Sequence, residues 1–165
     1  MDLVVDGTGS ALWNGRAMRC AVGRSGLAQQ KREGDGATPV GILPMRRALY
    51  RPDRETPPAT RLPVAPLAPD DGWCDAPGDP LYNRAVKLPY PAHAETMWRD
   101  DRLYDLVVVL GWNDAPVAKG AGSAIFLHLA APGWGPTEGC VALARDDLLA
   151  VLAGADATSR VIVRP

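Results

Sequence analysis

The chain has 165 residues, of which 47% are hydrophobic and 22% are charged, and its formal net charge is −1. This length and composition are typical of one globular domain, spanning residues 1–165, with a hydrophobic core of its own. A nearly neutral chain has no electrostatic footprint for nucleic acid or for an anionic membrane, so neither is expected as a partner. The longest aliphatic run, Leu106–Leu110, is far too short to cross a bilayer.

The first fifty residues contain short apolar runs separated by glycines. Residues 3–5 and 17–22 are expected to be strands, because short β-like runs between glycine turns favour hairpins over helices. The opening residues carry no basic segment, no long apolar stretch and no small-residue cleavage site, so they do not resemble a secretory signal. The expected location is therefore the cytoplasm, or the periplasm if a leader has been removed.

Residues 52–91 hold ten of the sixteen prolines of the chain. Proline at this density disfavours helices and central strands, because each ring removes a backbone donor and fixes φ. The same stretch contains Trp73, Tyr82 and Leu88, which makes it too apolar for a disordered linker. It is predicted to be a long ordered loop packed over the body, with one short strand near residues 85–87. Whether this loop covers the active site is left open.

The second half of the chain has clearer periodicity. A short helix is predicted over residues 91–99, a central strand over 104–110 and another strand over 123–129. A helix is predicted over residues 144–153, with Gly154 as its stop, and a last strand over 160–163. The expected fold is therefore mainly β with two short helices.

The chain has three cysteines, Cys20, Cys74 and Cys140, without any CxxC spacing. An odd count does not suit a disulfide framework, so we expect Cys20 and Cys74 not to be bonded to each other. Cys74 and His93 would supply only two zinc ligands, fewer than a zinc site needs. No metal or cofactor is expected.

His128 ends a strand-like run, and Cys140 follows twelve residues later, directly after Gly139. A thiol is mostly protonated at neutral pH, and a nearby imidazole can remove its proton to form the nucleophilic thiolate. Amide groups around residues 139–141 could point at the oxyanion that such an attack creates. Taken singly, the two residues also fit a core histidine and an inert buried thiol, so the pair alone is weak evidence.

The strings around these residues are more specific. The stretch SAIFLH at residues 123–128, followed by TEGCV at 137–141, resembles the signature of the L,D-transpeptidase (YkuD-like) family. The string KREGDGATPVGI at residues 31–42 is similar to an upstream turn-and-strand segment of that family, and Tyr104-Asp105 is a third, weaker match. The three segments occur in the family's order and cover most of the chain.

The resemblance implies a β-sandwich-like catalytic domain that acts on the peptide stems of bacterial peptidoglycan. Cys140 would attack the carbonyl before the terminal D-alanine, with His128 as its base and with Gly139 and Thr137 in the catalytic segment. The histidine would be oriented by a backbone carbonyl of Thr137 or Gly139. Trp112, Asn113, Trp134, Val141 and Arg145 are candidate substrate contacts.

Three features depart from the family pattern. Leu129 follows the histidine where many members have glycine, Ala142 stands where many have arginine, and the loop at residues 129–136 is short. These differences concern substrate handling rather than the nucleophile. They favour an L,D-carboxypeptidase that trims soluble muropeptides, with a cross-linking L,D-transpeptidase as the alternative.

Two other classes remain to be weighed. A non-catalytic peptidoglycan-binding domain would keep the fold without needing both His128 and Cys140. A papain-type protease would have its histidine after the cysteine, whereas His128 precedes Cys140 here. The sequence does not indicate an oligomeric state.

Overall fold

The structure is a computed structural model that describes all 165 residues. It contains fourteen strands, one α-helix and one 3-10 turn. The strands are β1 (Asp2–Asp6), β2 (Ser10–Trp13), β3 (Arg16–Ala21), β4 (Leu27–Ala28), β5 (Thr38–Pro39), β6 (Gly41–Tyr50), β7 (Val64–Pro66), β8 (Asp71–Cys74), β9 (Arg84–Lys87), β10 (Ala94–Thr96), β11 (Leu106–Leu110), β12 (Phe126–Leu129), β13 (Val141–Leu143) and β14 (Arg160–Arg164). The helix α1 spans Arg145–Gly154 and the 3-10 turn spans Pro132–Trp134.

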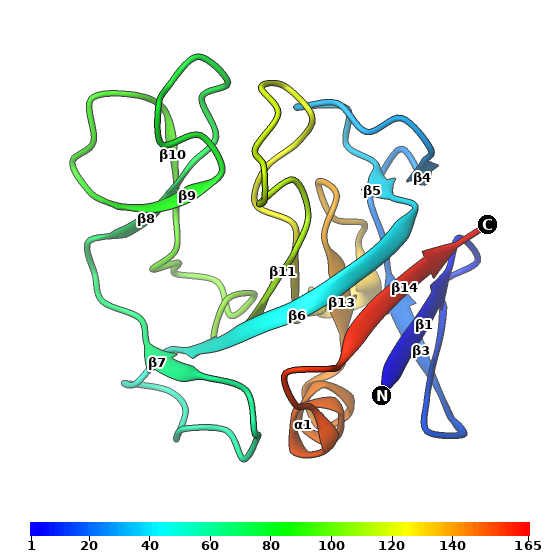
Figure 1. The fold of residues 1–165 in the computed structure, drawn as a ribbon. Coiled ribbons are helices and arrows are strands. Elements are labelled where there is room, and N and C mark those ends of the chain that lie inside the picture. Colours follow the sequence, from blue (N-terminus) through cyan, green and yellow to red (C-terminus); the bar gives the residue numbers. More distant parts are fainter.

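Nine strands form one sheet in the order β11-β12-β13-β3-β2-β1-β14-β6-β7. This sheet closes on itself, because β6 pairs with β14 through its first half and with β11 through its second half (Figure 1). The side chains inside it form the main core, and α1 adds Leu148, Val151 and Leu152 to that core. The expectation of a mainly β, sandwich-like domain is confirmed.

The end of the Pro-rich segment and the residues just after it supply a small second sheet of β10, β8 and β9, in that order. We call residues 71–96, which carry these three strands, the cap (upper left in Figure 1). None of its strands contains a proline, so the prolines lie in the connections, where a missing N–H costs nothing. The prediction of one long loop was therefore wrong, although its expected strand at residues 85–87 is present as β9.

The helix predicted over residues 91–99 is also absent. Residues 94–96 form β10, which pairs antiparallel with β8 through Ala94 opposite Cys74 and Glu95 opposite Trp73. The conformation of this segment is decided by its pairing with β8, about twenty residues earlier in the chain. The local sequence alone does not reveal that pairing.

Strands β11 and β12 are buried on both faces. Leu106, Val108 and Leu127 face the main core, whereas Val107 and Phe126 belong to a second apolar cluster that includes Trp73 of the cap. Because side chains alternate along a strand, His128 lies on the same face as Phe126. The imidazole therefore points to the side that the cap covers.

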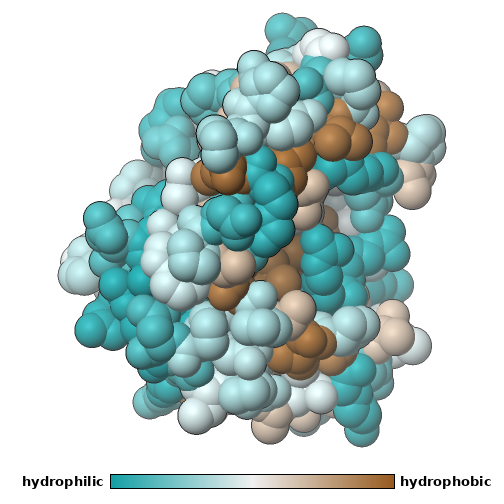
Figure 2. All heavy atoms as spheres, turned by 90° about the vertical axis from the view of Figure 1, so that its left-hand side faces the viewer, coloured by the Kyte–Doolittle hydropathy of each residue, from teal (hydrophilic) through white to brown (hydrophobic).

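No helix in the structure has the length and apolar character needed to cross a membrane. The face that carries the cap shows mainly hydrophilic residues, with smaller apolar patches between them (Figure 2).

Candidate active site

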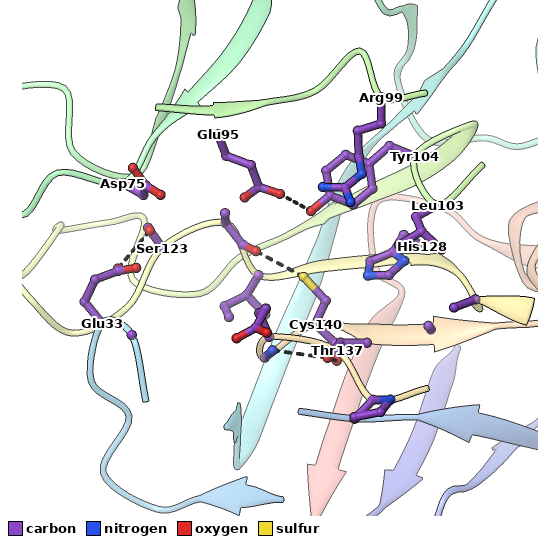
Figure 3. A pocket seen from close by; sticks show the side chains of 18 of the residues that line it. Glu33, Asp75, Glu95, Arg99, Leu103, Tyr104, Ser123, His128, Thr137 and Cys140 are labelled. Atoms are coloured by element: carbon purple, nitrogen blue, oxygen red, sulfur yellow. Dashed lines mark hydrogen bonds between the residues drawn. The ribbon is translucent and has the colours of Figure 1, made fainter. Parts of the chain in front are cut away.

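A cavity of about 420 Å³ lies between the cap and the main sheet. Cys140 and His128 line it from the main sheet, and Asp75, His93 and Glu95 line it from the cap. The sulfur of Cys140 points into this space between His128 on one side and Ser123 on the other (Figure 3). The two residues singled out from the sequence therefore share one cavity.

The Cys140 thiol is held by backbone groups of the segment that leads into β12. It donates a hydrogen bond to the Ala124 carbonyl at 3.2 Å and accepts one from the Phe126 N–H at 3.3 Å. Ala124 adopts a φ of 52°, a left-handed conformation that non-glycine residues rarely take. Such strained backbone often occurs at functional sites, and here it aims a carbonyl at the thiol.

The carbonyl of Cys140 is fixed from two sides. It accepts hydrogen bonds from the Thr137 hydroxyl at 2.6 Å and from the Thr38 hydroxyl at 3.2 Å. Thr38 belongs to the upstream motif at residues 31–42, so the two sequence motifs meet at the backbone of Cys140. The orientation of the cysteine therefore depends on both.

Gly139 is the residue whose lack of a side chain matters most here. Its φ is 140°, and a Cβ at this position would lie 2.9 Å from the Ala37 carbonyl oxygen. The Gly139 N–H donates to the Thr137 hydroxyl at 3.1 Å. That amide is occupied within the turn, whereas the Cys140 N–H has no hydrogen-bond partner and is the free donor beside the sulfur.

A buried cation lies beside this turn. Lys31 lines the cavity with its side chain only 4% exposed, and its ammonium group pairs with the Asp35 carboxylate. Asp35 also accepts hydrogen bonds from the Arg32 and Ala37 N–H groups at 2.8 and 2.9 Å. The Lys31–Asp35 pair therefore shapes the loop that packs against Gly139.

His128 is oriented by its neighbour along the chain. Its Nδ1 lies 2.8 Å from the Leu129 carbonyl oxygen, so Nδ1 carries the proton and Nε2 is left as the acceptor. The expected orienting carbonyl of Thr137 or Gly139 was wrong, because the ring turns back to the adjacent residue. Tyr104 packs against the imidazole edge to face, with ring centroids 5.2 Å apart.

Burial keeps both partners neutral. It lowers the pKa of His128 to about 4 and raises the pKa of Cys140 to about 12. No hydrogen bond joins the two residues, because the thiol is turned to the Ala124 carbonyl. The resting site is therefore a thiol beside a neutral imidazole, not an ion pair.

His93 lines the same cavity, but no hydrogen bond joins it to Cys140. His93 lines the rim of the cavity, and its Nδ1 lies 2.5 Å from an Asp75 carboxylate oxygen. Its side chain is 79% exposed, whereas His128 is buried. The two histidines therefore occupy different environments in one cavity.

Further polar groups that sequence reasoning missed line the cavity from the cap and from the upstream motif. Glu95 accepts a hydrogen bond from the Tyr104 hydroxyl, and burial raises the pKa of its carboxyl group. Glu33 accepts hydrogen bonds from Tyr82 at 2.5 Å and from Ser123 at 2.8 Å. Glu33 lies within the upstream motif, so the sequence contained a signal for it, but nothing linked Glu95 or Asp75 to the site.

Asn83 ties the cap to the strand that holds the thiol. Its amide oxygen accepts from Trp73 Nε1 at 3.0 Å and from the Ala124 N–H at 3.1 Å. Its amide nitrogen donates to the carbonyls of Trp112 and Asn113 at 2.9 and 2.8 Å. This buried side chain also fixes the backbone of Ala124, whose carbonyl accepts the hydrogen bond from the Cys140 thiol.

Five predicted substrate contacts do not line the cavity. Trp112 donates through Nε1 to the Ala121 carbonyl at 2.9 Å, and Asn113 bonds the backbone of its own loop at Ala118 and Gly122. Both side chains serve the turn after β11.

The other three are placed elsewhere for separate reasons. The Trp134 ring lies under the Arg19 guanidinium, 4.6 Å from its centroid. Val141 is fully buried in the main core, and Arg145 pairs with Glu55 at 2.5 Å. The cations that line the cavity are instead Lys31 and Arg99.

No group of three or more His, Cys, Asp or Glu side chains is arranged to hold a metal ion. Charged groups of the cavity are instead paired with other side chains, as Asp75 is with His93 and Lys31 with Asp35. The arrangement suits nucleophilic chemistry at the sulfur of Cys140.

Comparisons with known proteins identify the family of this chain. The sequence model of the YkuD family, described as the L,D-transpeptidase catalytic domain, matches residues 3–163. The chain belongs to this family. No curated protein matches it. Among solved structures it is similar to an L,D-transpeptidase from Mycobacterium smegmatis, with 15% identity and a TM-score of 0.46; the match covers 99% of this chain and 58% of that chain.

Proposed function

We propose that this protein is a cysteine-dependent L,D-carboxypeptidase that removes the terminal D-alanine from tetrapeptide stems of peptidoglycan fragments. The observation that carries the proposal is the cavity that Cys140 and His128 share, with the free N–H of Cys140 beside the sulfur. Membership of the L,D-transpeptidase family supports the choice of the peptide bond before the terminal D-alanine as the bond that is cleaved.

In the first half of the reaction, His128 Nε2 takes the proton of the Cys140 thiol as the sulfur attacks the carbonyl carbon before D-alanine. The N–H of Cys140 then stabilises the oxyanion. The C–N bond breaks when His128 returns the proton to the leaving amine of D-alanine. The product of this half is a thioester on Cys140.

In the second half, water replaces D-alanine in the cavity. His128 removes a proton from the water as its oxygen attacks the thioester carbonyl, and the sulfur leaves as a thiolate that recovers the proton. The released product is a tripeptide with a new carboxylate. Both halves use the same base, which suits an imidazole with one fixed and one free nitrogen.

The charges of the cavity suit a stem peptide, which carries both carboxylates and an amine. Lys31 and Arg99 line the cavity as cations that are each paired with an aspartate, and the carboxylic groups of its lining are those of Glu33, Asp75, Glu95 and Glu138. The cap limits the space to about 420 Å³, the size of a pocket for one small ligand. Water needs far less space than a second stem, which favours hydrolysis over transfer to an amine.

Transpeptidation is the alternative, and one observation favours it. The four acidic side chains of the cavity lining would attract an amine. A positioned amine competes strongly with water because positioning contributes a large effective molarity. The two outcomes share every step up to the thioester and differ only in the acceptor.

Incubation with a purified disaccharide tetrapeptide, followed by mass spectrometry of the products, separates them. We expect free D-alanine and disaccharide tripeptide in equal amounts, without dimer. Dimer as the main product at millimolar substrate would show that an amine is the acceptor. Binding of the tetrapeptide without any product would indicate a non-catalytic domain.

A further inference from the structure

A second hollow of about 320 Å³ lies where β6 and β9 meet, outside the cavity of Cys140. Three arginines line it, Arg46 and Arg47 from β6 and Arg84 from β9. Asp114 is the one carboxylate among its lining residues. No step of the proposed reaction uses these groups.

The arginines are only partly neutralised. Arg46 pairs with both carboxylate oxygens of Asp114, at 2.9 and 3.3 Å. Arg84 donates to the carbonyls of Asp114 and Asn83, at 2.7 and 3.2 Å, and has no carboxylate partner. Arg47 has no hydrogen-bond or ion-pair partner, and its guanidinium lies 5.7 Å from the centroid of the Trp73 ring. Two guanidinium charges therefore face the hollow without a counter-charge.

The arginines are also held in place. A Cβ at Gly111 would lie 2.7 Å from the Arg46 guanidinium, so the glycine leaves the room that this side chain occupies. Two carbonyls fix Arg84, and the indole of Trp73 lies beneath Arg47. Fixed donors cost little conformational entropy when a ligand binds.

We propose that this hollow is a binding site for a phosphate dianion, either free or carried as a monoester on a larger molecule. One guanidinium group is enough to neutralise one carboxylate, as Arg46 does for Asp114. The guanidinium groups of Arg47 and Arg84 have no carboxylate partner and come from separate strands. Together they match a tetrahedral anion with two negative charges.

The hollow adjoins the catalytic cavity. Ile125 lines both, and Trp73 and Asn83 line the hollow while they hold the segment at Ala124. A dianion bridging Arg47 and Arg84 would join β6 to β9 and so hold the cap to the main sheet. Phosphate binding therefore stabilises the folded protein and the cap that covers Cys140.

The test is isothermal titration of the full chain with inorganic phosphate, pyrophosphate and glycerol 3-phosphate at constant ionic strength, with thermal unfolding in parallel. The double variant Arg47→Gln/Arg84→Gln should bind at least about tenfold more weakly, a loss of about 1.4 kcal/mol. The matched control Arg102→Gln/Arg164→Gln removes the same charge from exposed positions and should bind as the wild type does. Arg47→Gln alone is a second variant. It should fold as the wild type does, because the Arg47 side chain makes no hydrogen bond, and it should also bind phosphate more weakly.

Tighter binding of glycerol 3-phosphate than of inorganic phosphate would identify an esterified ligand, and the reverse order a free anion; both support the proposal. Equal affinities of the double variant and the control would overturn it. So would the absence of binding at millimolar phosphate, or equal affinity for succinate. Activity on the tetrapeptide is read separately, so failure of the phosphate site leaves the carboxypeptidase proposal unaffected.

Discussion

At the scale of single residues, the site combines a thiol and an imidazole that are both neutral at rest. Burial produces this state, since it penalises the charged form of each group. In the proposed reaction the thiolate therefore forms during the attack and not before it, with His128 as a general base rather than as the cation of an ion pair.

Alkylation of Cys140 by iodoacetamide should consequently be slow at neutral pH. Because only the thiolate reacts and the pKa of Cys140 is about 12, the rate should rise about tenfold per pH unit up to at least about pH 9. Peptide mass spectrometry of the labelled cysteine gives the rate. A fast plateau at or below neutral pH would mean that a thiolate–imidazolium pair exists in the free enzyme.

His128 should make stability depend on pH in a defined window. Its pKa is about 4 in the folded chain and about 6.5 when exposed, so only the unfolded chain takes up the proton as the pH falls between these values. The stabilisation is present above about pH 6.5 and decreases by up to about 3 kcal/mol by pH 4. Urea unfolding of the wild type and of His128→Gln at several pH values measures it. Parallel pH profiles for the two proteins would contradict the assignment.

At the scale of elements, the cap makes an open cysteine–histidine pair into a cavity. It meets the rest of the protein through Trp73 against Phe126, with ring centroids 5.0 Å apart, and through three hydrogen bonds of Asn83, to Trp112, Asn113 and Ala124. The cap is thus connected directly to the Ala124 backbone that holds the Cys140 thiol.

Asn83→Ala should therefore affect both stability and catalysis. It leaves buried donors and acceptors unpaired, which costs about 2–4 kcal/mol in the free energy of unfolding. The rate of D-alanine release should fall as well, because the Ala124 segment loses its anchor. Leu81→Ala, at a neighbouring position that is 45% exposed, is the control and should change neither quantity appreciably. Wild-type activity of Asn83→Ala would show that the anchor is not needed.

Much of the main sheet could be predicted from local patterns. The run at residues 106–110, the segment ending at His128 and the helix after Ala144 have periodicities that depend on their own residues. The cap could not be predicted in the same way, because β8 and β10 are defined by pairing with each other across some twenty residues. Glu95 and Asp75 were missed for the same reason, since their place in the cavity depends on that pairing.

At the scale of the whole molecule, the three cysteines occupy different parts of the fold. Cys20 lies in the main core, Cys74 in the cap and Cys140 in the catalytic cavity, and all three are free and buried. Cys20 and Cys74 form no disulfide in the structure, in line with the expectation from the odd cysteine count.

Cys20→Ala/Cys74→Ala should therefore retain the rate of D-alanine release, with a modest loss of stability from the two small cavities. Thiol titration should find three reactive groups in the unfolded wild type and one in the unfolded double variant. A loss of activity similar to that of Cys140→Ala, with the fold intact by circular dichroism, would mean that a second thiol takes part in the chemistry.

The central claim is that Cys140 carries the acyl group. Rapid mixing of the protein with disaccharide tetrapeptide, acid quenching and intact mass spectrometry measures this directly. The account predicts an adduct with the mass of the substrate less D-alanine, located by peptide mapping on Cys140 and absent from Cys140→Ala and Cys140→Ser. Release of D-alanine by Cys140→Ala, or an adduct on Cys20 or Cys74 in the wild type, would contradict it.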